Sequence, residues 1–253
     1  MLNLFNLEGK VAMVTGASRG LGRAMAVALA GACADIVAVA SASENAAQTV
    51  SDIEALGRNS KALGCRQDDP ADVRRAVRDG IDAFGQVDIL VNNAGTIRRA
   101  PAEEYSDEDW SMVMDTNLNG LFQFCRGIGK HMLEREQGKI INIASLLSFS
   151  GGITVPAYAA SKGGVMQLTK ALANEWANRG IQVNAIAPGY FATDNTAALQ
   201  ADETRNRQIL ARIPTGRWGE SEDLQGAIIF LASDASNYVN GHILTVDGGW
   251  MAR

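Results

Sequence analysis

Two residues four positions apart, Tyr158 and Lys162, carry side chains that together could move a proton. Their spacing predicts that both side chains leave the same face of a helix, one turn apart. A phenol titrates near pH ~10 when it is unperturbed, and an adjacent ammonium favours the phenolate. We therefore expect Lys162 to lower the pKa of Tyr158, so that the phenol exchanges a proton with an alcohol or ketone oxygen.

Ser145 supplies a third polar group for the same chemistry. It ends the apolar, β-branched run 139–145, which predicts a strand. Open α/β sheets bind their ligands beyond the carboxyl ends of the strands. Ser145 is therefore placed to hydrogen-bond the substrate oxygen that exchanges a proton with Tyr158.

A glycine-rich turn follows the apolar run 10–15 and precedes an alanine-rich helical stretch at 21–33. Its glycines allow a tight turn and a close approach of the backbone to a pyrophosphate, which the helix N-terminus also attracts. The alternative is a helix entry made tight for packing alone. The residues expected to form this dinucleotide site are Gly16, Ser18, Arg19, Gly20, Leu21 and Gly22.

The end of the second apolar run, 35–40, bears on the choice of dinucleotide. A carboxylate there would hold a ribose 2′-hydroxyl, whereas an arginine would accept a 2′-phosphate. The run continues into Ser41 and Ser43 without a carboxylate before Glu44. Arg19 could meet a phosphate, and Ser41 and Ser43 could donate to it, so these residues tolerate NADP(H), unless Arg19 is simply a solvated loop charge.

Short apolar runs alternate with helical stretches along the whole chain. These elements must position the candidate catalytic and cofactor-binding residues. Strands are expected at 10–15, 35–40, 61–65, 88–93, 139–145, 181–187 and 242–246, and helices at 21–33, 44–56, 71–84, within 107–136, 156–179 and 220–232. This alternation predicts one α/β domain with a doubly wound parallel sheet. The segment 190–218 shows no clear rhythm, and we predict that it is a lid or binding loop.

Composition excludes several classes of protein. The net charge of −5 over 253 residues argues against nucleic acid as a partner, because phosphate binding needs concentrated positive charge. The sequence has three cysteines, Cys33, Cys65 and Cys125, and none of them forms a CxxC pair. We therefore expect neither a disulfide framework nor a zinc site, and we expect the protein to reside in the reducing cytoplasm. No apolar run reaches about 18 residues, so the sequence predicts no membrane span, and the start of the chain does not look like a signal peptide.

Several motifs together resemble one family in order and spacing. They are TGASRGLG (15–22), NNAG (92–95), Asn117, Ser145, Tyr158-x-x-x-Lys162 and PGxxxT (188–193), and they resemble the short-chain dehydrogenase/reductase family over essentially the whole chain. The resemblance implies a Rossmann-type, seven-stranded sheet, a bound nicotinamide dinucleotide and a homotetramer. It also implies that Tyr158 is the general acid/base, that Lys162 holds the ribose hydroxyls and that Ser145 polarises the substrate carbonyl. Asn117 would support a water-linked proton path to Lys162.

The resemblance implies further cofactor contacts. Residues expected to line the adenosine ribose and the sheet edge are Asn93, Ala94 and Gly95, and those expected on the nicotinamide and pyrophosphate side are Pro188, Gly189, Phe191 and Thr193. One position departs from the family pattern. Arg66 stands where many members carry an acid that receives the adenine amino group, so we expect Asp68 to serve with a shift in register.

Longer segments narrow the resemblance to family members that act on six-carbon sugar acids. They include NNAGTIRR (92–99), RIPTGRWG (212–219) and YVNGHILTVDGGWMAR (238–253). The implied reaction is hydride transfer between the nicotinamide and a secondary alcohol carbon of a keto-acid sugar of the 2-deoxy-D-gluconate or 2-dehydro-3-deoxy-D-gluconate type. Because such enzymes mostly use NAD, the expectation is NAD(H) or NADP(H) with a slight lean to NAD(H).

The substrate carboxylate calls for a guanidinium, whose forked N–H groups match its geometry. The expected substrate residues are Arg98, Arg99, Arg217 and Trp250. The alternative for the arginines is that they form surface or intersubunit ion pairs. Trp250 belongs to a C-terminal tail that we expect to reach a neighbouring active site in the tetramer, or else to anchor an interface.

Three alternative functions remain open. The glycine turn and the stretch 43–48 also resemble 3-oxoacyl-carrier-protein reductases, and a gluconate 5-dehydrogenase-like reductase is a related possibility. From a different class, the chain could be a dinucleotide-binding regulator without turnover. The intact set of Ser145, Tyr158, Lys162 and Asn117 argues against a regulator.

Overall fold

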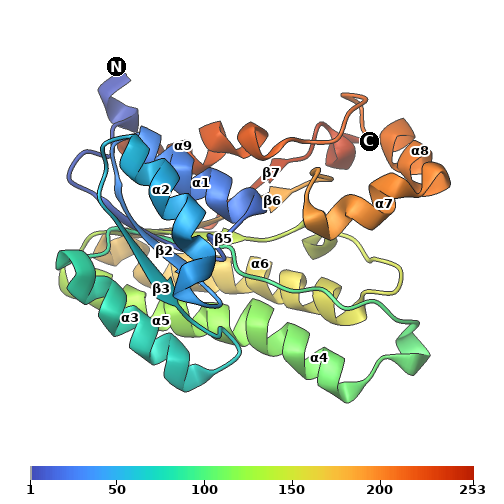
Figure 1. Cartoon of the computed structure of the whole chain (residues 1–253), viewed down its shortest axis with the longest axis horizontal. Helices are drawn as coiled ribbons and strands as arrows, with labels where there is room; N and C mark the ends of the chain where they lie inside the picture. Colours follow the sequence, from blue (N-terminus) through green and yellow to red (C-terminus); the bar gives the residue numbers. More distant parts are fainter. Residues whose placement is uncertain (1) are drawn as a thin grey trace.

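The computed structural model describes residues 2–253 and shows seven parallel strands in one sheet, in the order β3-β2-β1-β4-β5-β6-β7 (Figure 1). The strands are β1 (Val11–Thr15), β2 (Asp35–Ala40), β3 (Ser60–Gly64), β4 (Ile89–Asn92), β5 (Gly138–Ile143), β6 (Ile181–Pro188) and β7 (Ile243–Val246). Every neighbouring pair is parallel. The strand order reverses between β1 and β4, where open α/β sheets form their ligand-binding crevice.

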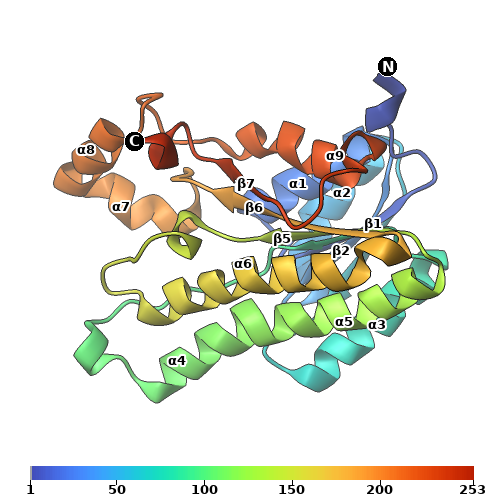
Figure 2. The ribbon, with the colours of Figure 1, turned by 180° about the vertical axis from the view of Figure 1, so that it is seen from behind.

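Helices cover both faces of the sheet (Figures 1 and 2). One face carries α1 (Gly20–Gly31), α2 (Ala47–Ala55) and α9 (Gln225–Ala232), and the other carries α3 (Pro70–Phe84), α5 (Gly120–Glu134) and α6 (Pro156–Trp176). An apolar cluster lies on each side, one including Leu29 and Ile228, the other Phe124 and Val165. The single Rossmann-type domain expected from the continuous apolar runs is confirmed, because strands buried on both faces need no alternation.

Local sequence signals set the helix ends. Asp69 caps α3 by accepting a 2.8 Å hydrogen bond from the Ala71 backbone N–H, and Pro70 occupies the first helical position. Gly85, with φ of 75°, ends that helix in the left-handed conformation that favours glycine. Pro156 likewise occupies the first position of α6, two residues before Tyr158.

The structure differs from the expected elements in two places. The segment 190–218 contains α7 (Ala197–Ala201) and α8 (Glu203–Arg212), so the expectation of no regular structure is wrong. Asp202 caps α8, but only Ile209 on that helix is buried, which leaves the apolar period weak in the sequence. The helical stretches expected within 107–136 are confirmed: α4 (Asp107–Met114) continues through a π-helical turn into α5. Ser145 lies two residues beyond β5 rather than at its end.

No helix within residues 2–253 has both the length and the apolar character needed to cross a membrane. Over the same residues, no group of three or more His, Cys, Asp or Glu side chains could hold a metal ion. Cys33, Cys65 and Cys125 are free thiols, as the sequence predicts.

Candidate active site

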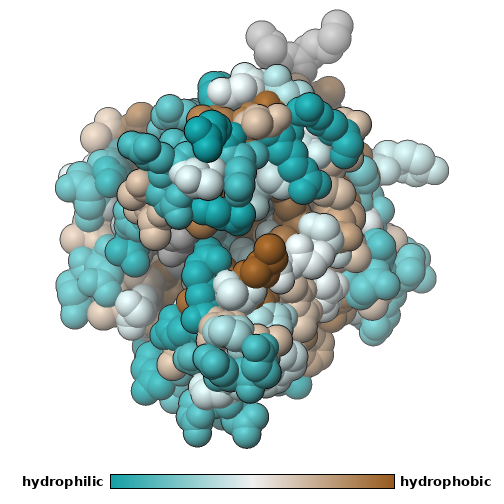
Figure 3. Space-filling view, turned by 90° about the vertical axis from the view of Figure 1, so that its right-hand side faces the viewer, coloured by the Kyte–Doolittle hydropathy of each residue, from teal (hydrophilic) through white to brown (hydrophobic). Residues whose placement is uncertain are grey.

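A cavity of about 990 Å³ opens at the carboxyl edge of the sheet. Its walls come from the glycine turn, the ends of β2 and β4, the turn after β5, the start of α6 and the segment from Pro188 to Arg212. Figure 3 looks onto this edge and shows a hollow beneath a band of hydrophilic side chains. The predicted cofactor and catalytic groups therefore meet in one space.

The glycine turn leaves room for a ligand because no side chain fits there. Gly16 and Gly20 have φ of 65° and 54°, and a Cβ at Gly22 would overlap the Gly16 carbonyl oxygen and the Asn93 amide. Asn93 Nδ2 donates to the carbonyl oxygens of Thr15 (3.0 Å) and Gly16 (3.1 Å), which fixes the turn against the end of β4. The turn and the start of α1, which no side chain caps, fit the pyrophosphate of a dinucleotide.

The residues expected to bind the cofactor line this cavity, except Ser43. These residues are Gly16, Ser18, Arg19, Gly20, Leu21, Gly22, Ser41, Asp68, Asn93, Ala94, Gly95, Tyr158, Lys162, Pro188, Gly189, Phe191 and Thr193. Two of the charged ones are already paired at the rim. Arg19 lies 3.4 Å from the carboxylate of Asp194, and Asp68 lies 3.0 Å from the guanidinium of Arg66.

The structure brings the three proton-transfer side chains together. Tyr158 lies in the first turn of α6, and Lys162 Nζ is 5.8 Å from the centroid of its ring. Lys162 Nζ donates a 2.6 Å hydrogen bond to the carbonyl oxygen of Ile143, at the end of β5. The Ser145 hydroxyl hydrogen-bonds the Tyr158 side chain and accepts a 3.2 Å bond from the Leu147 N–H.

The balance of forces on these groups differs from the sequence-based expectation. Burial raises the pKa of Tyr158, while the hydrogen bond with Ser145 and the charge of Arg99 pull that pKa down. Burial also lowers the pKa of Lys162 to about 8. Desolvation dominates, so the pKa of Tyr158 is raised overall, and Arg99 is a cation that acts on the phenol. A lowering of this pKa by Lys162 stays a prediction.

Asn117 is fully buried in the π-helical turn and does not line the cavity. Its Oδ1 accepts a 2.8 Å bond from the Thr96 N–H, and its Nδ2 donates to the Thr96 carbonyl oxygen and the Ser161 hydroxyl. The carboxamide thus ties the loop after β4 to α6. A role for Asn117 in a proton path to Lys162 stays a prediction.

The four expected substrate residues fall into two pairs. Arg99 and Trp250 line the cavity, whereas Arg98 and Arg217 do not. Arg98 Nε lies 3.3 Å from the Asp109 carboxylate. The Arg217 guanidinium holds Asp223 through two bonds of 2.6 and 2.8 Å. These two arginines make the intramolecular ion pairs that compete with a substrate role, and their assignment as carboxylate anchors is not supported.

Trp250 lies in the cavity of its own chain, although the tail was expected to reach a neighbouring site. Its ring centroid is 4.6 Å from that of Tyr190, and it packs in an apolar cluster with Leu146, the residue after Ser145. The C-terminal turn therefore forms part of this chain's own cavity wall.

The contribution of α8 to the cavity wall is not apparent from the sequence. Cavity-lining residues on this helix are Arg205, Gln208, Ile209 and Arg212. Their spacing is i, i+3, i+4 and i+7, which places them on one helical face. That period could have identified a functional face, but three of the four residues are polar and do not register as a hydrophobic stripe.

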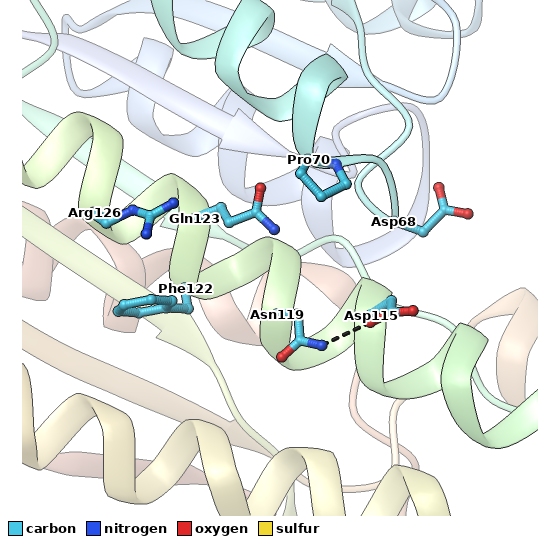
Figure 4. Close-up of a pocket in the computed structure, with 7 residues that line it drawn as sticks. All are labelled: Asp68, Pro70, Asp115, Asn119, Phe122, Gln123 and Arg126. Carbon is cyan, nitrogen blue, oxygen red and sulfur yellow. Dashed lines mark hydrogen bonds between the residues drawn. The ribbon is translucent and has the colours of Figure 1, made fainter.

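A second, smaller pocket of about 370 Å³ lies between the start of α3 and the junction of α4 with α5 (Figure 4). The residues that line it are Asp68, Pro70, Asp115, Asn119, Phe122, Gln123 and Arg126. Asn119 Nδ2 donates to Asp115, and the Arg126 guanidinium lies 5.5 Å from the centroid of the Phe122 ring. It shares Asp68 with the large cavity, but none of the proton-transfer residues.

The parallel sheet, the glycine turn and the Ser-Tyr-Lys set define a class that comparison with known proteins confirms. The short chain dehydrogenase family matches residues 10–204. The chain belongs to the short-chain dehydrogenase/reductase family and is an NAD(P)-dependent oxidoreductase.

Three relatives narrow the comparison. The chain is 55% identical to 2-dehydro-3-deoxy-D-gluconate 5-dehydrogenase from Pseudoalteromonas atlantica, over 100% of both sequences. A crystal structure of a putative 2-deoxy-D-gluconate 3-dehydrogenase from Agrobacterium tumefaciens with bound NADP has a TM-score of 0.93 and 54% identity, covering 99% of this chain and 100% of the other. The gluconate 5-dehydrogenase from Burkholderia cenocepacia, in complex with NADP and tartrate, has a TM-score of 0.96 and 42% identity, covering 100% and 99%. The NADP in these structures gives no support to the expected lean toward NAD(H).

Proposed function

We propose that the protein interconverts a secondary alcohol and a ketone on a six-carbon sugar acid of the 2-dehydro-3-deoxy-D-gluconate type, with NADP(H) as the cofactor. The observation that carries this proposal is the charge of the cavity. Among residues 2–253, its acidic lining residues are Asp68 and Asp194, and both are paired with arginines at the cofactor end. The remaining wall carries the guanidinium groups of Arg99, Arg205 and Arg212, which attract an anionic substrate.

The proton-transfer step follows from the side chains already in place. When bound, the nicotinamide supplies or accepts the hydride. Tyr158 gives a proton to the substrate oxygen in reduction and takes it back in oxidation, and the Ser145 hydroxyl donates a hydrogen bond to that oxygen. Lys162, fixed by its bond to the Ile143 carbonyl, holds the ribose hydroxyls and places a positive charge behind the phenol. Asn117 supports this arrangement by tying α6 to the loop after β4.

The cofactor assignments extend along the cavity. The glycine turn would hold the pyrophosphate, Arg19 and Ser41 the 2′-phosphate, and Asp68 the adenine edge. The other expected contacts are Asn93, Ala94 and Gly95 at the adenosine ribose and Pro188, Gly189, Phe191 and Thr193 toward the nicotinamide. NADP bound to relatives with 54% and 42% identity supports the choice of NADP(H).

Three further expectations belong to this proposal. The segment 190–218, with α7 and α8, closes over the bound substrate as a lid. The active form is a homotetramer, carried over from the family resemblance. The enzyme works in the cytoplasm, in line with its free cysteines.

A rate comparison on the purified protein tests the proposal. We expect oxidation of 2-dehydro-3-deoxy-D-gluconate with NADP⁺ to show the highest kcat/KM among four combinations of this acid or gluconate with NADP⁺ or NAD⁺. Faster reduction of a 3-oxoacyl thioester by NADPH would instead favour the acyl-carrier-protein reductase alternative. Binding of NADPH without turnover of any of these substrates would favour a regulator.

A further inference from the structure

Arg212 and Trp250 form a stacked pair in the wall of the cavity. The guanidinium carbon of Arg212 lies 4.1 Å from the centroid of the Trp250 ring, and both residues line the cavity. Trp250 is itself buried and packs against Tyr190 and Ile209. Stacking on a fixed indole holds the plane of the guanidinium while leaving the N–H groups at its edges free to donate.

Arg212 differs from Arg98, Arg205 and Arg217 in having no competing partner. Within residues 2–253 it makes no ion pair, and its side chain makes no hydrogen bond. Arg98 and Arg217 are paired with aspartates outside the cavity, and Arg205 donates to the side chain of Gln208. A carboxylate that enters the cavity therefore meets Arg212 without first breaking an ion pair.

Arg99 is also free of an ion pair in the described chain, but it lines the cavity from a different element. It belongs to the loop after β4, and its charge acts directly on Tyr158. Arg212 belongs to α8, which lies in a different layer from α4 and α6 at the same end of the molecule (Figures 1 and 2). A guanidinium beside the phenol suits the reacting oxygen, whereas the one on α8 suits a distant carboxylate.

We propose that Arg212, stacked on Trp250, binds the carboxylate of the substrate and that the oxidised carbon lies at the far end of the same molecule, beside Tyr158 and Arg99. This inference rests on the proposed function and deepens it, because it assigns the acid group and the reacting carbon to opposite walls. Trp250 acts as a positioning residue. The site then selects six-carbon acids whose carboxylate is remote from the reacting alcohol.

Paired substrates test this division of labour. The holoenzyme is assayed with 2-dehydro-3-deoxy-D-gluconate and with its C1 amide, which keeps the reacting carbon but lacks the charge. We expect Arg212→Gln to lower kcat/KM for the acid by about 10- to 100-fold, mainly through KM, the size of a lost charge-assisted hydrogen bond. The same variant should leave kcat/KM for the amide unchanged. Arg212→Lys should fall between the two, since it keeps the charge but loses the fork.

Two further variants make the result specific. Arg99→Gln should reduce turnover of the acid and the amide alike, because Arg99 serves the reacting end. Arg207→Gln, on an exposed position of the same helix outside the cavity, should alter neither. Unchanged circular dichroism and NADPH affinity show that each variant is folded.

The outcomes separate the inference from the proposed function. Equal losses on acid and amide in Arg212→Gln, or no loss on the acid, would overturn the role of Arg212 while leaving the sugar-acid activity in place. Failure of the unmodified enzyme to turn over the acid would overturn the proposed function itself. If Arg99→Gln lowered kcat/KM for the acid but not for the amide, the carboxylate would lie beside Tyr158 instead, and the assignment to opposite walls would be refuted.

Discussion

The ammonium of Lys162 donates a 2.6 Å hydrogen bond to the carbonyl oxygen of Ile143, the last residue of β5. A second bond joins the same segments, because the Ser148 hydroxyl donates to the backbone carbonyl of Lys162 at 2.7 Å. Together they fix the start of α6 against the turn that carries Ser145. The relative positions of Ser145 and Tyr158 are thus set by the protein itself, as preorganised catalysis requires.

Replacing Tyr158 with phenylalanine should remove the proton-transfer group while preserving the ring that packs near Lys162. We expect kcat to fall at least about 100-fold, the usual contribution of a positioned general acid or base. NADPH affinity, measured by fluorescence, should be retained. Tyr238→Phe is the matched control because that side chain is fully exposed and lies outside the cavity. A fully active Tyr158→Phe enzyme would eliminate the proposed mechanism.

The pH dependence of alcohol oxidation should report the charge of Arg99. Oxidation needs Tyr158 as the phenolate, so the rate rises with pH through the pKa of this group. Arg99 lowers that pKa, so Arg99→Gln should move the rising limb of kcat/KM to higher pH. Arg98→Gln, which loses a pair with Asp109 outside the cavity, should leave the limb in place. An unmoved limb in Arg99→Gln would show that another group governs the profile.

A methyl group at Gly22 should damage the cofactor site, because its Cβ would overlap the Gly16 carbonyl oxygen and the Asn93 amide. We expect Gly22→Ala to weaken NADPH binding by about 10-fold or more, in keeping with the cost of overpacking. Gly226→Ala, also in a helix but with no atom near its Cβ, should instead stabilise the fold by about 0.5–1 kcal/mol. Equal NADPH affinity in the two variants, measured by titration, would contradict the role of the glycine turn.

Arg19 should decide between the two dinucleotides. Its guanidinium lies at the cavity rim, paired with Asp194. We expect Arg19→Gln to raise the KM for NADPH by about 10-fold or more, since a charge-assisted bond to the 2′-phosphate is lost. The KM for NADH should stay the same. Arg23→Gln, whose side chain pairs with Asp52 outside the cavity, is the control, and a parallel loss with both cofactors would dismiss this role for Arg19.

The sequence alone predicted the sheet and most of the residues expected to line the large cavity, for a physical reason. Strands such as β1 and β5 are buried along their whole length, so they appear as uninterrupted apolar runs. The glycine turn and the Tyr158-Lys162 pair are likewise local patterns. Their chemistry depends on neighbours within a few residues, which a single sequence displays directly.

The substrate side was harder to predict because it depends on contacts made only in the folded chain. Arg98, Arg99 and Arg217 look alike in the sequence, yet the first and last are neutralised by aspartates that the fold brings to them. The sign of the Tyr158 pKa shift depends on how fully the phenol is desolvated, which spacing cannot reveal. Arg212 gains its contact with the Trp250 ring only when the end of α8 packs against the C-terminal turn.

That C-terminal turn carries a practical consequence for handling the protein. Arg253 lies three residues after Trp250, and its Nη1 donates a 3.0 Å hydrogen bond to the carbonyl oxygen of Ala211 on α8. A purification tag fused at this end would begin beside the cavity wall and compete with that bond. The segment Leu2–Phe5, at the other end of the described chain, lies far from α8 in Figure 1, so affinity handles, fluorophores and surface-immobilisation linkers are better attached on that side.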